Sequence, residues 1–389
     1  MSMLKLLKVG SCLAPGSEEA TEILVAAEKV IAIGHDLANN LAGFESEIID
    51  CGTKSIAVPG LIDQHVHILG GGGEGGYHTR VPELMLSEIV RCGVTTVVGM
   101  LGTDDVTRHL ESLLAKALAL ETEGITAYIL TGSYALPTPT LTGSVKRDLV
   151  LIDKVLGAGE IAQSDHRASK AGYQALKDVA AACRLGGLLS GKAGLLHLHL
   201  GDDPEGLAPV RRLVEERVIP IRQIVVTHVN RNRRLFLEAV DYLRAGGNID
   251  LTSFAFPGDD ALTVVAAIKK LKAEGLSLER VTVSSDANGS MPRVDDQGQV
   301  IGLLAASMDT LLADLQALYR EEVLDLKELL ALVTTNPARL LGLPHKGTLT
   351  VGADADITVF DSELNVNHVL ARGQVMVAAG AVVKKGTFE

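Results

Sequence analysis

A His-x-His pair has residue types and spacing suited to gripping one metal ion. His65 and His67 end the apolar run that begins at Ala57. Because strand side chains repeat every second position, both imidazoles would leave the last residues of a strand on the same face. An isolated pair of this kind is common by chance, so two ordinary polar residues leaving a strand is the alternative on this motif alone.

Other ligand-type side chains recur along the chain at the spacing of a repeating strand–helix unit. Glu160, His199, His228 and Asp286 lie 95, 134, 163 and 221 residues after His65. A (β/α)₈ barrel of about 250 residues has units of roughly 31 residues, which places these side chains at strands one, four, five, six and eight. The carboxyl ends of such strands form one face, which holds the active site. We therefore expect these residues to meet there.

Imidazoles and carboxylates in this number could hold two divalent cations, for which Zn²⁺ is the first choice. Two metals about 3.5–4 Å apart can clamp a displacement and generate a hydroxide between them. We expect Glu160 to bridge the metals. Asp286 would touch one metal with one oxygen and use the other to take the proton of the hydroxide and pass it to the leaving group.

The elements that must position these residues alternate between strands and helices, which favours a parallel sheet buried on both sides. Strand-like runs lie at 94–99, 127–131, 194–199, 224–228, 248–252 and 280–286. Helix-like segments lie at 111–122, 173–185, 235–245 and 260–274, and two more at 303–319 and 326–335 would close the barrel. We expect a metal-binding (β/α)₈ barrel, the TIM-barrel architecture, as the catalytic domain at residues 58–343.

Both ends of the chain have a different texture, with short strands separated by turn residues. These runs lie at 4–9, 22–26, 29–34 and 47–50, and again at 347–352, 355–360, 368–371 and 374–377. The pattern is typical of antiparallel strands. We expect one small β-sandwich domain built from residues 1–57 and 344–389.

Composition excludes several classes of protein. Only 3% of residues are aromatic, Trp is absent and the net charge is −12, which disfavours binding to nucleic acid. The four cysteines lie far apart, as expected of reduced thiols rather than a disulfide framework. No run of about 18 apolar residues predicts a membrane span, and the start of the chain is too interrupted for a signal peptide. We expect a cytoplasmic protein that binds neither nucleic acid nor membrane.

Several motifs in order carry a resemblance to a known family. They are the segments 59–67, 70–74, 164–167, 227–232 and 284–290, followed by the ending Ala-Asp-Ala-Asp-Ile at 353–357. With them the chain resembles the metal-dependent amidohydrolases and, among these, the isoaspartyl dipeptidases, which cleave β-aspartyl dipeptides. The similarity covers nearly the whole chain. It implies one metal bound by His65, His67 and Asp286 and another bound by His199 and His228.

The resemblance also implies how a dipeptide would be held. Glu74 would pair with the free α-amino group, and Tyr134 would steady the carbonyl oxygen as it becomes an oxyanion. The groups implied for the two substrate carboxylates are the backbone near Gly72, Thr103, Arg167, Arg231 and Ser290. For Glu74 the alternative is a solvated charge, for Arg231 an exposed salt bridge, and for Tyr134 simple packing.

One position departs from the family pattern. The bridging ligand of the family is typically a carboxylated lysine, whereas the aligned position here is Glu160. Its side chain is shorter, so the backbone must approach the metals, and the glycines at 157 and 159 permit this. We predict that activity needs no bicarbonate. Lys154, in a helix-like stretch, is the disfavoured alternative, and whether Glu160 alone replaces the lysine stays open.

Two more side chains are expected to support the site without reacting. We interpret His197 as a core histidine or one that supports a metal ligand, and Asp63 as the acceptor of a buried structural hydrogen bond.

The sequence as a whole predicts a binuclear metallo-dipeptidase, a homo-oligomer in line with the family, that hydrolyses isoaspartyl dipeptides. The alternatives are an amidohydrolase acting on a cyclic imide or an N-acyl amino acid, and a scaffold that has lost its chemistry. The metal's identity, the preferred residue after the isoaspartate, the oligomer size and closure of the loop at 70–76 stay open.

Overall fold

Eight parallel strands form a nearly closed barrel in the computed structural model, which describes residues 4–17, 19–253, 260–294 and 300–389. The strands are β7 (Leu61–Val66), β8 (Val94–Gly99), β9 (Thr126–Thr131), β10 (Val155–Gln163), β11 (Leu195–Leu200), β12 (Ile224–Thr227), β13 (Asn248–Thr252) and β14 (Val281–Ser284). They lie side by side in chain order, and a bridge between Val66 and Ala287 joins the last strand to the first. The predicted barrel is confirmed.

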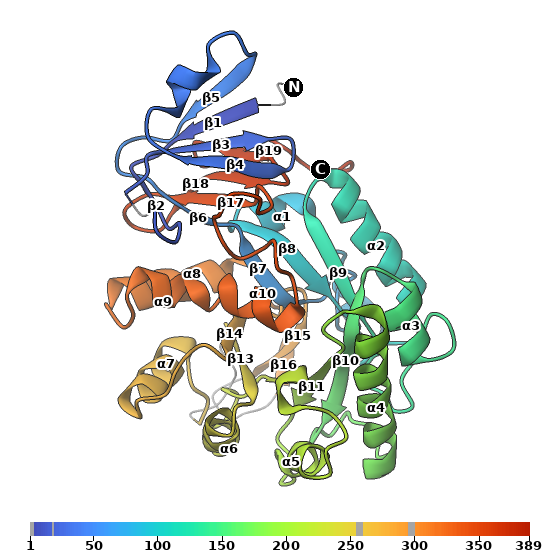
Figure 1. Ribbon diagram of the computed structural model, residues 1–389. Coiled ribbons are helices and arrows are strands. Elements are labelled where there is room, and N and C mark those ends of the chain that lie inside the picture. Colours follow the sequence, from blue (N-terminus) through green and yellow to red (C-terminus); the bar gives the residue numbers. More distant parts are fainter. Residues whose placement is uncertain (1–3, 18, 254–259, 295–299) are drawn as a thin grey trace.

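Helices cover the outside of the barrel (Figure 1). They are α1 (Leu86–Val90), α2 (Leu110–Glu123), α3 (Val145–Leu151), α4 (Gly172–Ser190), α5 (Ala208–Glu215), α6 (Arg233–Arg244), α7 (Val264–Ala273), α8 (Asp309–Arg320), α9 (Leu326–Ala331) and α10 (Thr335–Leu341). Side-chain caps begin several of them, as when Asn232 accepts a hydrogen bond from the Leu235 amide at the start of α6. Within the described segments, no helix has the length and apolarity required to cross a membrane.

Two further sheets combine strands from both ends of the chain. One has the order β4-β3-β1-β5 and the other β2-β6-β17-β18-β19-β20. Their bounds are β1 (Leu4–Lys8), β2 (Ser11–Cys12), β3 (Glu22–Ala26), β4 (Lys29–Gly34), β5 (Ser46–Asp50), β6 (Ile56–Pro59), β17 (Ile357–Phe360), β18 (Val366–Ala371), β19 (Gln374–Ala378) and β20 (Ala381–Val382). Buried side chains from both sheets, such as Ile23 and Val359, form one core. The small β domain agrees with the prediction, while its limits at 57 and 344 stay predicted.

The sheet domain leads directly into the strand that carries the His-x-His pair. Only Gly60 separates β6 from β7, and a Cβ there would lie 2.3 Å from the Thr95 hydroxyl oxygen. A side chain at this position would therefore clash with Thr95 of the neighbouring strand β8. Near the same junction, the buried ammonium of Lys346 pairs with Asp354 and Asp356 of the Ala-Asp-Ala-Asp segment. These contacts explain that motif structurally.

Three local predictions were wrong. Residues 347–352 form turns rather than a strand, because Gly347 and Gly352 have positive φ angles of 70° and 91°. The first part of the helix predicted at 303–319 is instead the strand β16 (Val300–Ala305), which pairs with β15 (Ser290–Val294). Lys154 lies in a turn before β10 and pairs with Glu121, not in a helix.

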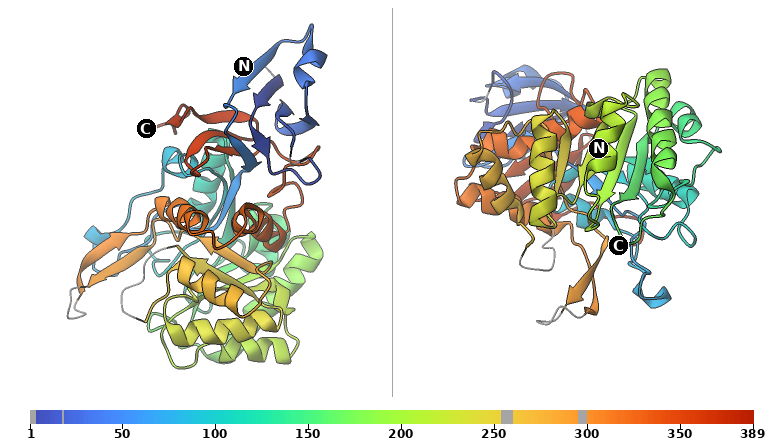
Figure 2. Two further views of the ribbon diagram at one scale, coloured as in Figure 1. Left: turned by 90° about the vertical axis from the view of Figure 1, so that its left-hand side faces the viewer. Right: turned by 90° about the horizontal axis from the view of Figure 1, so that it is seen from below.

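The hairpin β15–β16 projects from the barrel beside the segment that contains the short helix η2 (Tyr77–Thr79), as both views in Figure 2 show. The base of the hairpin is joined to the glycine-rich loop, since Gly71 donates its amide hydrogen to the Asn288 carbonyl oxygen. Hairpin and loop thus form a wall above the carboxyl ends of β7 and β14.

Candidate active site

The six residues predicted as metal ligands lie together and buried at the carboxyl ends of their strands. His65 and His67 point to one place from the end of β7, and both Nε2 atoms face Asp286 Oδ1, at 3.4 and 3.1 Å. His199 and His228 face a second place from β11 and β12. The alternation of side chains along a strand accounts for the His-x-His geometry.

Glu160 stands between the two pairs of histidines, and each of its oxygens faces a different pair. Oε2 lies 3.3 Å from His65 Nε2 and 3.7 Å from His67 Nε2. Oε1 lies 2.7 Å from His199 Nδ1 and 2.9 Å from His228 Nε2. A carboxylate in this position could contact a cation on each side.

The donor atoms meet the requirements of a metal centre. Three sets of ligand atoms each lie within 4.8 Å of one another: His65, His67 and Glu160; His65, His228 and Asp286; and Glu160, His199 and His228. Among the described residues, His65 Nε2, Glu160 Oε2 and Asp286 Oδ1 are buried without a hydrogen-bond partner. Unpaired buried polar atoms are costly, and a cation among them would satisfy all three. The residues therefore fit divalent metal ions.

The electrostatics of the cluster also favour a positive charge. Burial opposes protonation of His65, yet the carboxylates of Glu160 and Asp286 outweigh it and raise the pKa of His65 to about 10. Burial favours the neutral form of Asp286, but a hydrogen bond to His67 and the nearby histidine charges lower its pKa to about 2. The carboxylates of the cluster thus favour a positive charge among them.

Two of the ligands have left-handed backbones. His228 has a φ of 61° and Asp286 a φ of 53°, and each lies just after its strand. Side chains other than glycine rarely adopt this conformation, which costs about 1–2 kcal/mol. Both residues therefore carry backbone strain at the point where their side chains enter the site.

Three buried polar groups support the ligands. Asp63 accepts hydrogen bonds from the backbone amides of His65 and Ser285, which confirms its interpretation as a structural acceptor that ties β7 to the end of β14. His197 Nε2 lies 3.0 Å from His65 Nδ1. Thr252 Oγ1 lies 2.7 Å from His228 Nδ1. The ring nitrogens of His65 and His228 that face away from the centre are therefore partnered.

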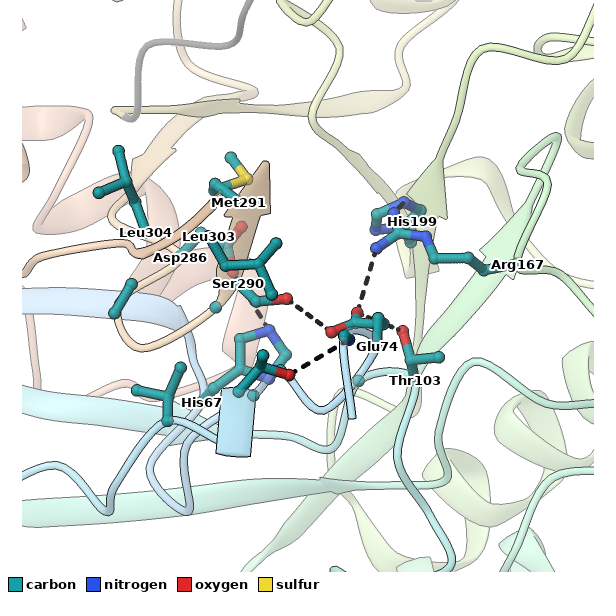
Figure 3. Close-up of a pocket in the computed structure, with 18 of the residues that line it drawn as sticks. His67, Glu74, Thr103, Arg167, His199, Asp286, Ser290, Met291, Leu303 and Leu304 are labelled. Carbon is teal, nitrogen blue, oxygen red and sulfur yellow. Dashed lines mark hydrogen bonds and ion pairs between the residues drawn. The ribbon is translucent and has the colours of Figure 1, made fainter. Parts of the chain in front are cut away.

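A cavity of about 1000 Å³ opens above the metal ligands. Glu74 lies at its wall, between Thr103, Ser290 and Arg167 (Figure 3). The hydroxyls of Thr103 and Ser290 donate to its two oxygens, at 3.1 and 2.8 Å, and Arg167 Nη1 lies 3.5 Å away. Glu74 is therefore a partly exposed carboxylate that three side chains hold at the cavity wall.

Arg167 and Arg231 both lie beside His199, and Arg167 also faces Glu74. Arg167 donates to both oxygens of Asp165, at 3.0 and 3.1 Å, and Arg231 donates to the Leu200 carbonyl oxygen at 2.7 Å. Both guanidinium groups line the cavity. Arg231 is thus partly buried in the site, contrary to the alternative of an exposed surface pair.

Tyr134 reaches the same part of the site from the segment after β9. Its hydroxyl lies 2.8 Å from His199 Nδ1, and burial raises its pKa well above the usual value. The phenol therefore keeps its proton and can donate a hydrogen bond toward the centre. Its place at the centre is more specific than simple packing.

Gly72 lies buried in the cavity wall with a φ of 77°. A Cβ at this position would lie 2.4 Å from the Thr79 carbonyl oxygen, so the turn requires glycine. The backbone of the loop can therefore come close to a ligand.

Sequence reasoning missed two features of the site. Asp165 lies 2.9 Å from His199 Nε2 while also holding Arg167, and the Ser-Asp-His-Arg motif was the available signal. Met291, Leu303 and Leu304 of the hairpin line the cavity with apolar side chains. The mistaken first part of the helix predicted at 303–319 concealed the second feature.

Comparisons with known proteins agree with this geometry. A family model described as "Amidohydrolase family" matches residues 262–376. The β-aspartyl dipeptidase from Fervidobacterium islandicum AW-1, solved in complex with the β-Asp-Leu dipeptide, is 41% identical, and the match covers 98% of each chain with a TM-score of 0.91. The chain belongs to the β-aspartyl dipeptidase family. As a member of this family within the amidohydrolases, it is a metal-dependent hydrolase of amide bonds.

More distant relatives match this β-aspartyl dipeptidase family member over nearly its whole length. A dihydroorotase from Aquifex aeolicus is 26% identical over 420 residues, covering 92% of this chain and 90% of the relative. The structure of a dihydropyrimidinase from Brevibacillus agri NCHU1002 is 17% identical with a TM-score of 0.64, covering 99% and 97% of the two chains. The second likeness shows the fold alone.

Proposed function

We propose that the protein hydrolyses β-aspartyl dipeptides with two divalent metal ions bridged by Glu160. The observation that carries the proposal is that the two oxygens of Glu160 face different pairs of histidines. The similarity to the Fervidobacterium enzyme supports the substrate class. Zn²⁺ suits the donor set, because imidazole nitrogen dominates it and carboxylate oxygens complete it.

The charges in the cavity match a dipeptide with one free amino group and two carboxylates. Glu74 would accept the α-ammonium group of the isoaspartyl residue, and Thr103 and Ser290 beside it would turn toward the carboxylate on the same carbon. The backbone at Gly72 would approach that carboxylate too. Arg167 and Arg231, which lie beside His199, would bind the carboxylate of the second residue. The scissile amide would then lie over the metal ligands.

The metal ions would polarise the scissile carbonyl and lower the pKa of an attacking water. Asp286 Oδ1 faces His65 and His67, so this carboxylate would accept a proton at the centre and deliver it to the departing amine. The Tyr134 hydroxyl would donate to the carbonyl oxygen as negative charge develops on it. Glu160 would contact both halves of the centre and keep them in a fixed relative position.

The experiment is a comparison of amide substrates with the zinc-loaded full-length protein. We expect turnover of β-Asp-Leu but not of α-Asp-Leu, N-acetylaspartate or dihydroorotate. Cleavage of dihydroorotate or N-acetylaspartate without cleavage of β-Asp-Leu would replace the dipeptidase proposal by the cyclic or N-acyl alternative. Absence of bound zinc and of all turnover would favour a scaffold without chemistry.

Two variants test the bridge. Glu160→Ala should abolish turnover and lower the zinc content. Lys154→Ala is the matched control, because Lys154 pairs with Glu121 at the far end of β10 and should keep wild-type activity. Bicarbonate should have no effect on decarbonated enzyme, and restoration of activity by it would contradict a glutamate bridge. A homo-oligomeric assembly and a cytoplasmic location stay predictions.

A further inference from the structure

His197 contacts the candidate metal centre indirectly, through one of its ligand residues, His65. It lies on β11 two residues before His199, and its buried side chain points to the same side of the strand. Its Nε2 atom lies 3.0 Å from His65 Nδ1, and the two rings meet edge to face with centroids 4.9 Å apart. One strand therefore places a ligand-type side chain, His199, in one half of the centre and contacts the other half through His197.

The direction of the hydrogen bond follows from what His65 must do. Its Nε2 atom faces Glu160 and Asp286, so a metal ion between them requires a lone pair on this nitrogen. A neutral imidazole has one protonated nitrogen, which places the proton of His65 on Nδ1. His65 then donates to His197 Nε2, which must accept. This contact selects one of two tautomers and also fixes the ring plane.

The position of His197 is itself tightly constrained. A Cβ on Gly159 would lie 2.7 Å from His197 Cβ and 3.0 Å from its carbonyl oxygen. Because Gly159 lacks a side chain, the strand carrying Glu160 packs directly on the residue that orients His65. The close contact between Gly159 and His197 therefore helps to fix the positions of both Glu160 and His65.

We infer that His197 is a positioning residue that holds His65 in the metal-binding tautomer and orientation and so sets the affinity of the centre for its first metal ion. The inference rests on the proposed function in taking His65 as a ligand. It does not depend on which amide is cleaved.

The test compares two amide side chains of different reach at this position. In His197→Gln the amide extends to the place of Nε2 and can accept from His65, whereas in His197→Asn it reaches only the place of Nδ1. Metal-free full-length protein is titrated with Zn²⁺ against a chromophoric chelator. We expect His197→Asn to weaken the tighter zinc site by about 10- to 100-fold and His197→Gln to remain within about threefold of wild type.

The paired design separates positioning from damage to the core, because both substitutions introduce a neutral amide at the same buried site. Thermal unfolding of the metal-free variants should show similar losses for both. Equal zinc affinity in both variants, whether unchanged or reduced, would overturn the inference, as would a wild-type protein without zinc affinity. Zinc affinity that follows the order Gln above Asn supports the inference even when β-Asp-Leu is not cleaved, and in that case only the proposed substrate fails.

Discussion

At the scale of single residues, the environment of the centre shifts the pKa values of neighbouring histidines in opposite directions. Burial lowers the pKa of His228 to about 3, whereas the carboxylates around His65 raise its pKa to about 10. The pKa values of two histidines whose ring centroids lie 5.1 Å apart are therefore shifted in opposite directions. Such divergent pairs mark the place where a cation belongs.

Replacing Tyr134 tests the role of a single atom, the oxygen of its hydroxyl group. Tyr134→Phe removes the hydroxyl 2.8 Å from His199 Nδ1, and we expect kcat for β-Asp-Leu to fall about 10²- to 10³-fold with little change in KM. Steady-state kinetics would measure kcat and KM separately. The control is Tyr242→Phe, which removes a buried hydroxyl without a hydrogen-bond partner in the described structure and should leave kcat unchanged. Equal kcat in the Tyr134 variant and wild type would remove Tyr134 from the oxyanion role.

At the scale of elements, strand β10 carries Glu160, and its glycines also let it pack closely against β11. Gly159→Ala should lower the free energy of unfolding by about 1–3 kcal/mol, since the new methyl group would overlap His197. It should also reduce bound zinc by displacing Glu160. Denaturant unfolding and metal analysis would measure both effects.

Gly34→Ala in β4 is the matched control for that variant. A Cβ there would meet only Leu37 Cδ2, at 3.8 Å, so stability and zinc content should be retained. A Gly159→Ala protein as stable as this control would show that the contact between β10 and β11 is not as close as described.

Helix α8 carries a carboxyl group, that of Asp314, which should make the free energy of unfolding depend on pH. Burial raises the pKa of Asp314 from 3.8 to about 7. The folded protein holds this proton up to about pH 7 while the unfolded chain loses it near pH 4, so the free energy of unfolding falls as pH rises between these values. Asp314→Asn should therefore stabilise the protein at pH 8, by on the order of 1 kcal/mol, and have little effect at pH 4.

The control for this prediction lies on the same helix. Asp309 forms an exposed pair with Arg91, so Asp309→Asn should change stability by less than about 0.5 kcal/mol at either pH. Urea unfolding at the two pH values would measure the difference. The same gain for Asp314→Asn at pH 4 as at pH 8 would contradict a raised pKa.

At the scale of the whole molecule, the metal centre should contribute to stability, because its ligands come from five different barrel strands. Removal of metal by a chelator leaves Glu160 and Asp286 buried among histidines, and we expect the Tm to fall by several degrees. Calorimetry with and without chelator would measure the shift, and excess Zn²⁺ should reverse it. A Tm independent of Zn²⁺ concentration would mean that the folded chain gains nothing from binding.

The sequence by itself determined the barrel, the small β domain and the chain order of the ligand residues. Strands and helices recurring about every 31 residues place His65, Glu160 and Asp286 at the same end of the first, fourth and eighth units, and this period is a local property of the chain. The mistaken helix at 303–305 shows the limit of this reasoning, because a short apolar run fits a strand or a helix equally well.

Only the tertiary structure decided how the two oxygens of Glu160 divide between the histidine pairs, and that His197 supports His65 from 132 residues away. It also decided that the hairpin lines the cavity. These features depend on the packing of one strand against another, and no local pattern encodes the distance between side chains so far apart in the chain. The position of Glu160 depends on Gly159, which leaves room for β11, and this contact forms only when the barrel closes.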